Sequence, residues 1–235
     1  MGCNSSKGVE ASNPTAVALE RKLVLAVERA RGKGTPKGSF STLLLTFPKL
    51  RGGFTKVRAL FKELDINGDG GIEWHEFLER CPRIGLDPST PSLKEMFALA
   101  DMENKQAIGS DEMILVFTII YLLEPDFKDK IKYPEIIVAL QILEKAFIFL
   151  DPSNTGYINR DEMSLAVKSG TRVTHGKQSK SIADKLFDTL DWDGSGRITF
   201  KEFMVGIEKL VMEDSDEDNA YDELGEVDEA DEMKG

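Results

Sequence analysis

The segment Asp65-Ile-Asn-Gly-Asp-Gly-Gly-Ile-Glu-Trp-His-Glu76 decides how the rest of this chain is organised. Side chains that carry oxygen recur at positions 1, 3, 5, 9 and 12, and a glycine stands at position 6, where the loop must turn sharply. Ca2+ takes about six to eight oxygen ligands, including a carbonyl at position 7 and a bidentate carboxylate at position 12, and this spacing supplies them. The candidate ligands are Asp65, Asn67, Asp69, the carbonyl of Gly71, Glu73 through a water, and Glu76.

Three further segments of the same length begin at Asp101, Asp151 and Asp191, and we number the four loops in chain order. Loops 3 and 4 keep an oxygen at each required position, although hydroxyls replace two carboxylates in loop 3, and a lower ligand charge weakens calcium binding. The candidate ligands in loop 3 are Asp151, Ser153, Thr155, the carbonyl of Tyr157 and Glu162; those in loop 4 are Asp191, Asp193, Ser195, the carbonyl of Arg197 and Glu202.

Loop 2, from Asp101 to Glu112, keeps acidic residues at positions 1, 3 and 12 of the pattern but departs from it at positions 5 and 6. Lys105 places an ammonium where position 5 needs an oxygen, and Gln106 replaces the turning glycine. Ile108 still stands at position 8, where paired loops of this kind join through a short two-stranded ladder. We therefore expect loop 2 to be the structural partner of loop 1, and the chain to bind two or three calcium ions, at loops 1 and 4 and at loop 3.

Apolar residues at helical spacing flank every loop, which predicts an all-α fold of four helix–loop–helix units in two pairs. The expected organisation is a basic N-terminal extension with an amphipathic helix (1–53), a first pair (54–123), a connector (124–135), a second pair (136–212) and a tail (213–235). The tail is too acidic and too poor in apolar residues to fold alone, so we expect it to be disordered.

Composition limits the classes of function. The chain has 235 residues, a net charge of -11 and two cysteines, which makes a disulfide framework implausible. The segment from Glu213 to Gly235 carries this whole charge, whereas residues 1–53 have a net charge of +6. His75 lies inside loop 1 and His175 in a polar insert, so neither has the ordered partners that a catalytic base requires. We expect neither enzymatic activity nor nucleic-acid binding, and a monomeric protein.

The N-terminus fits a lipid-anchoring pattern. Gly2 is a candidate myristoylation site, and the adjacent Cys3 is a candidate palmitoylation site. Two acyl chains, or one chain with basic residues, anchor a protein stably. A basic amphipathic helix follows, from Pro14 to Arg31, and either contacts anionic lipid or packs on the body. A short apolar helical face from Phe40 to Phe47, which Pro48 is expected to stop, either docks on the body or meets a partner.

The four loops give residues 54–212 a specific resemblance to the calmodulin superfamily. With the Met-Gly head and the segment Lys37–Lys49, the layout is similar to the acylated calmodulin-like proteins of plants and green algae, and more distantly to calcineurin B-like and neuronal sensor proteins. The resemblance implies two calmodulin-like lobes and a calcium sensor that binds a target protein through an amphipathic helix, at the cytoplasmic face of a membrane such as the plasma membrane. A calcium buffer, or a dedicated regulatory subunit of a phosphatase, kinase or channel, stays open as an alternative.

Overall fold

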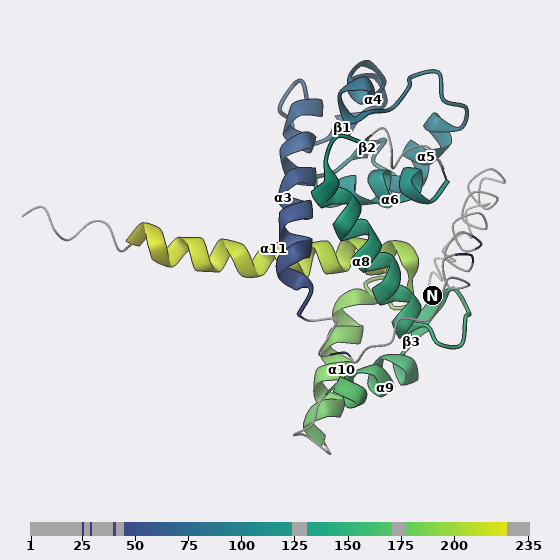
Figure 1. Ribbon diagram of the computed structural model, residues 1–235, viewed down its shortest axis with the longest axis vertical. Helices are drawn as coiled ribbons and strands as arrows, with labels where there is room; N and C mark the ends of the chain where they lie inside the picture. The colour runs from purple at the N-terminus through teal and green to yellow at the C-terminus, as the bar shows by residue number, and fades with distance from the viewer. Residues whose placement is uncertain are drawn as a thin grey trace, which may run out of the picture.

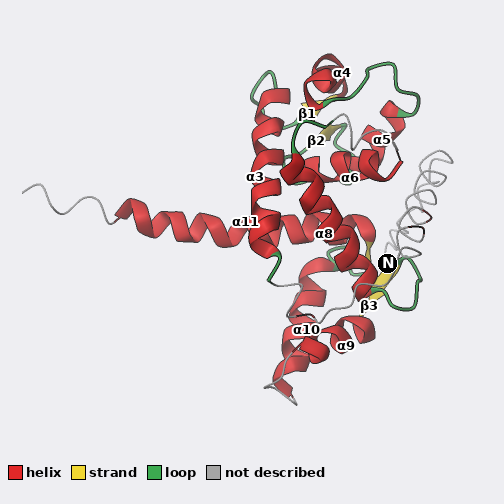
Figure 2. Ribbon diagram, viewed as in Figure 1, coloured by secondary structure: helices red, strands yellow, loops and turns green. Residues whose placement is uncertain are grey.

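The computed structural model describes Leu25, Arg29, Phe40 and residues 45–123, 131–170 and 177–224, and gives the backbone alone for residues 170, 177–181 and 214–224. The fold is all-α apart from two short two-stranded ladders, which confirms the predicted class (Figure 2). The elements are α3 (Phe47–Leu64), β1 (Ile72–Glu73), α4 (Trp74–Arg80), the 3-10 helix η1 (Cys81–Ile84), α5 (Leu93–Ala100), β2 (Ala107–Ile108), α6 (Met113–Leu123), α8 (Pro134–Leu150), β3 (Tyr157–Asn159), α9 (Arg160–Gly170), α10 (Lys177–Leu190), β4 (Arg197–Thr199) and α11 (Phe200–Leu224).

The loops pair as the position-8 residues predict. In the first ladder, β1 and β2 run antiparallel with Ile72 opposite Ile108, and both side chains are fully buried. In the second ladder, Ile158 of β3 faces Ile198 of β4. A β-branched side chain suits this pleated, buried position. Loop 2 therefore serves as the structural partner of loop 1, as expected.

The two pairs, which the resemblance describes as two calmodulin-like lobes, share one hydrophobic core. The first helices of the two pairs, α3 and α8, pack against one another and cross at an angle (Figure 1). Gly53 permits this close crossing, because a Cβ atom there would lie 2.5 Å from Cβ of Ala139 and 2.8 Å from the carbonyl oxygen of Glu135. The expectation of two pairs holds for the loops, while their helices form a single body.

Helix α6 lies at the centre of this body. All residues from Met113 to Tyr121 are buried, and the helix packs against α5, α3 and α11. A helix that is apolar on every side needs neighbours on every side. Two of these neighbours, α3 and α5, belong to the same pair as α6, and the third, α11, comes from the other pair. No helix within the described ranges combines the length and the hydropathy needed to cross a bilayer.

Two expected boundaries differ in the structure. The stop expected at Pro48 is wrong: Pro48 is the second residue of α3, because proline fits the first turn of a helix, where its missing N–H is not needed. The boundary expected at Glu213 falls inside α11, whose backbone remains helical to Leu224. Phe40 is buried in the shared core, so the apolar face from Phe40 to Phe47 contacts the body at its first residue. The extension from Gly2 to Arg31 lies outside the described residues except for Leu25 and Arg29.

Candidate metal centres

Loop 1 is held in shape by its own candidate ligands. The Asp65 carboxylate accepts hydrogen bonds from the N–H groups of Gly68 (2.8 Å) and Gly70 (3.1 Å). Both glycines have a positive φ, a backbone conformation that costs glycine little. The Asp69 carboxylate accepts a hydrogen bond from Nδ2 of Asn67, so the ligands at positions 3 and 5 face one another. These bonds tie the side chains of positions 1, 3 and 5 to the loop backbone and to one another.

Glu76 closes loop 1 from the first turn of α4. Its side chain is buried; Oε1 accepts hydrogen bonds from the N–H groups of Ile66 (3.0 Å) and Asn67 (3.2 Å), and Oε2 accepts one from Glu73 (3.0 Å). The Glu73 side chain caps α4 in return and lies 3.0 Å from Nδ1 of His75. Because Glu73 has this capping role, its water-mediated contact with a cation stays a prediction. The carboxylate at position 12 is already aimed into the loop.

Loop 4 brings its carboxylates closest together. One oxygen each of Asp191, Asp193 and Glu202 lie within 4.8 Å of one another. The Ser195 backbone N–H donates to Asp193 at 2.8 Å and holds the pKa of that carboxyl below its usual value. The Ser195 hydroxyl lies 3.0 Å from the carbonyl oxygen of Arg197, so positions 5 and 7 also converge.

Glu202 gives the clearest sign that loop 4 is built for a cation. Its side chain is 4% exposed, and Oε2 accepts hydrogen bonds from the backbone N–H (2.8 Å) and hydroxyl (2.7 Å) of Thr199. Oε1 is buried and has no hydrogen-bond partner among the described residues. An unsatisfied buried oxygen costs about 1–3 kcal/mol, more when it is charged, and a bound cation would satisfy it. The donor set of loop 4 therefore fits Ca2+.

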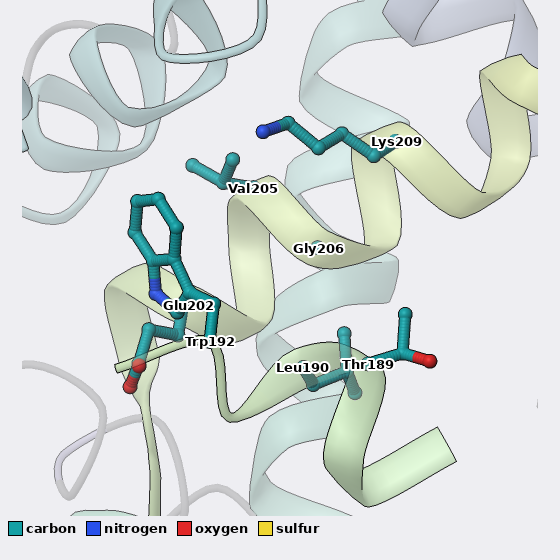
Figure 3. Close-up of a pocket in the computed structure, with 7 residues that line it drawn as sticks. All are labelled: Thr189, Leu190, Trp192, Glu202, Val205, Gly206 and Lys209. Atoms are coloured by element: carbon teal, nitrogen blue, oxygen red, sulfur yellow. The ribbon is translucent and has the colours of Figure 1, made fainter. Parts of the chain in front are cut away.

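A cavity of about 70 Å³ lies beside loop 4, between the end of α10 and the first turns of α11 (Figure 3). Glu202, Val205 and Lys209 of α11 line it together with Trp192 from position 2 of the loop. The Lys209 Nζ atom lies 5.6 Å from the centroid of the Trp192 ring, within reach of a cation–π interaction. Loop 4 thus contacts its own exit helix beyond the ligand at position 12.

Loop 3 has the same backbone frame with a weaker ligand set. Asp151 is buried and accepts hydrogen bonds from the N–H groups of Thr155 and Gly156, each at 3.0 Å. The Ser153 hydroxyl donates to Oε1 of Glu162 at 2.5 Å, which joins the ligands at positions 3 and 12. The two acidic ligands, Asp151 and Glu162, face hydroxyls and not further carboxylates. This arrangement agrees with the weaker affinity predicted for loop 3.

Loop 2 contains a cation of its own. Lys105 Nζ forms an ion pair with the Glu103 carboxylate, so positions 5 and 3 neutralise one another. Glu112, at position 12, accepts hydrogen bonds from the N–H groups of Met102 (2.8 Å) and Gly109 (2.9 Å), and burial raises its pKa. Gln106 has a φ of 64°, a conformation that favours glycine. The loop therefore keeps its fold while an ammonium occupies the place of a ligand oxygen.

Restoring the carboxylate at position 5 and the glycine at position 6 should create a calcium site in loop 2. We expect the double substitution Lys105→Asp and Gln106→Gly to raise the calcium stoichiometry measured by calorimetry by one ion, because it supplies the position-5 carboxylate and the position-6 turn. Gln106→Gly alone is the control; it relieves the backbone and should leave the stoichiometry unchanged. An unchanged stoichiometry in the double variant would show that Lys105 is not what prevents binding.

The structure also shows contacts between the pairs that the sequence did not indicate. Arg58 of α3 forms an ion pair with Glu208 of α11, and Lys209 of α11 forms one with Asp111 at position 11 of loop 2. Arg58 and Glu208 are 150 residues apart in the chain. The one sequence signal for these contacts was the acidic Glu208 between the apolar Ile207 and the basic Lys209. This pattern is common on any amphipathic helix, so it did not single out Glu208.

Comparison with known proteins agrees with this geometry. An EF-hand domain pair model matches residues 141–207, and a single EF-hand model matches residues 57–81. A protein of Arabidopsis thaliana described as "Probable calcium-binding protein CML21" is 31% identical over 205 residues, which cover 85% of this chain and 87% of the relative. The chain belongs to the calmodulin superfamily of EF-hand proteins. Loops 1, 3 and 4 lie within the matched residues, and loop 2 lies between the two matches.

Other EF-hand relatives differ in how much of their length is matched. "Probable calcium-binding protein CML22" of Arabidopsis thaliana is 24% identical over 207 residues, covering 85% of this chain and 90% of the relative. "Calcium-dependent protein kinase 2" of Zea mays is 25% identical over 147 residues, which cover 63% of this chain and 25% of the kinase. The resemblance to the kinase is thus confined to a quarter of that protein.

Proposed function

We propose that this EF-hand protein is a non-enzymatic calcium sensor that binds Ca2+ at loops 1, 3 and 4. The observation that carries the proposal is the buried and unpartnered Oε1 atom of Glu202 beside Asp191 and Asp193. The two relatives matched over most of their length are described as calcium-binding proteins. A bound Ca2+ would supply the positive charge that these carboxylates lack, while the N–H groups of the loops hold the carboxylates in place.

The proposed output is an apolar surface for an amphipathic helix of a target protein. In sensor EF-hands, calcium changes the angle between the helices that flank a loop and exposes such a surface. Glu76 and Glu202 each stand in the first turn of an exit helix, so a change at either carboxylate moves that helix. The apolar helix α6, against which α11 packs, is a surface that such a movement would uncover.

Two tryptophans make the proposal testable without labels. Trp74 packs against Phe77 and Phe97, with ring centroids 6.0 and 5.5 Å away, so its fluorescence reports on the contact between α4 and α5. Trp192 in loop 4 is 47% exposed. We expect micromolar Ca2+ to change both signals and to increase the binding of an apolar dye. Calcium binding with no dye response would indicate a buffer, and no calcium binding would refute the proposal.

We further propose that the protein is anchored at the cytoplasmic face of a membrane through acyl chains on Gly2 and Cys3. This rests on the sequence pattern and on the basic extension, since both residues lie outside the described part of the chain. We expect fractionation to find the natural protein in membranes with or without Ca2+, and the Gly2→Ala variant in the soluble fraction. A natural protein that becomes soluble when Ca2+ is added would contradict stable anchoring by two chains.

A further inference from the structure

Helix α11 links a calcium loop of one EF-hand pair to the helices of the other pair. It begins at Phe200, position 10 of loop 4, and carries Glu202, the candidate ligand at position 12, in its first turn. It then packs against α3 and α6 of the first pair (Figure 1). Glu208 and Lys209 follow Glu202 by six and seven residues, a rise of roughly 9–10.5 Å along a helix. Both residues make ion pairs across the boundary between the pairs.

The ion pair between Arg58 and Glu208 is the stronger of the two connections. Arg58 Nε lies 2.7 Å from Oε1 of Glu208, and Nη2 lies 3.3 Å from Oε2, so the contact is bidentate. The Glu208 side chain is fully buried and Arg58 is 30% exposed. Burial raises the pKa of Glu208, which means that its charge depends on Arg58. Separating a buried charge from its partner is costly, so the two helices are constrained to move together at this point.

Lys209 makes the second connection. Its Nζ atom lies 2.8 Å from Oδ2 of Asp111 in loop 2, and this hydrogen bond raises the pKa of Lys209. The same ammonium lies near the ring of Trp192 in loop 4, and Figure 3 shows the side chain directed back along α11 towards that ring. One side chain therefore contacts a loop of each pair.

The base of α11 is fixed by close packing. A Cβ atom at Gly206 would overlap Cδ2 of Leu190, the last residue of α10. This contact leaves α11 little room to slide against its own pair, so a displacement of Glu202 is passed along the helix. Packed elements of this kind switch between discrete positions more readily than they deform.

We infer that α11 couples calcium binding at loop 4 to calcium binding at loop 1, with Arg58 and Glu208 as the positioning residues; the inference rests on the proposed calcium binding. Arg58 lies seven residues before Asp65, the first ligand of loop 1, on the same helix. Through this ion pair, the position that α11 takes when loop 4 binds Ca2+ also sets the position of α3, the helix that leads into loop 1. The proposed coupling is positive and, as a binding free energy, reciprocal.

The test uses the full chain with Trp192→Phe, which leaves Trp74 as the one tryptophan and keeps an aromatic ring beside Lys209. Calcium is titrated by Trp74 fluorescence, with loop 4 intact or disabled by Glu202→Gln. Coupling free energies between sites are typically about 1–3 kcal/mol, so disabling loop 4 should weaken calcium binding at loop 1 at least about fivefold. An affinity of loop 1 that does not depend on Glu202 would overturn the inference.

The same titrations with Arg58→Met and Glu208→Met together isolate the ion pair. Replacing both partners leaves no buried charge alone, so the fold should be retained, and the effect of Glu202→Gln on loop 1 should fall below about twofold. Arg160 and Asp188, paired at 2.6 Å within the second EF-hand pair, provide the matched control, and replacing both by Met should leave the coupling intact. Undiminished coupling without Arg58 and Glu208 would also overturn the inference. A chain in which Trp74 never responds to Ca2+ would instead refute the calcium-binding proposal itself.

Discussion

We expect Glu76→Gln to weaken calcium binding at loop 1 by at least about 100-fold, equivalent to about 2.7 kcal/mol. The substitution removes one negative charge and one of the two oxygens of the bidentate ligand, while the side chain keeps its size. We expect loop 2 to offer no second site in this pair, so no neighbouring ion should compensate. The calcium-dependent change in Trp74 fluorescence should therefore disappear at concentrations that saturate the natural protein, and calorimetry should count one ion fewer.

Glu112→Gln is the matched control for this prediction. Glu112 occupies position 12 of loop 2, is buried, and accepts backbone hydrogen bonds in the same arrangement as Glu76. The same loss of a carboxylate oxygen therefore falls on a loop that we expect to bind no calcium. The stoichiometry and the Trp74 response should both be retained. A loss of one ion in Glu112→Gln would show that loop 2 binds calcium despite Lys105.

We expect Gly53→Ala to destabilise the protein by about 1–3 kcal/mol, because the added methyl group overpacks the crossing of α3 and α8. The new Cβ atom would lie 2.8 Å from a backbone carbonyl oxygen, which cannot move aside as the end of a side chain can. Chemical denaturation should show a lower free energy of unfolding. Because this crossing joins the two EF-hand pairs, calorimetric unfolding should also become less cooperative.

The adjacent Gly52 gives the control at the next position of the same helix. A Cβ atom there meets nothing within 4 Å, and the residue is exposed. Alanine is a better helix former than glycine, so Gly52→Ala should raise the free energy of unfolding by about 0.5–1 kcal/mol. A lower free energy of unfolding for Gly53→Ala and a higher one for Gly52→Ala would identify the close approach of α8 to Gly53 as the cause. A stabilising effect of Gly53→Ala would show that the two pairs do not cross as tightly as described.

The elements that could be predicted from the sequence are those held by hydrogen bonds between residues that lie close together in the chain. The Asp65 carboxylate binds N–H groups three and five residues further on, and Glu76 binds N–H groups no more than ten residues away. The position-8 residue Ile72 pairs with its counterpart Ile108 because each loop carries the same signal. The loss of ligand chemistry in loop 2 was likewise visible at Lys105. Pro48 was misjudged because proline can follow one helix and begin another, and the residues beside it do not decide which.

The sequence by itself determined the twelve-residue loops, their candidate ligand oxygens and their pairing, because a loop satisfies its own carboxylates through backbone N–H groups that lie close in the chain. Only the tertiary structure decided that the pairs share one core, through the approach of Gly53 to Ala139, and that α11 joins them through Arg58 and Glu208. Those contacts connect residues 86 and 150 positions apart. Apolar burial and buried charge depend on what the whole fold brings together, and no local pattern encodes that choice.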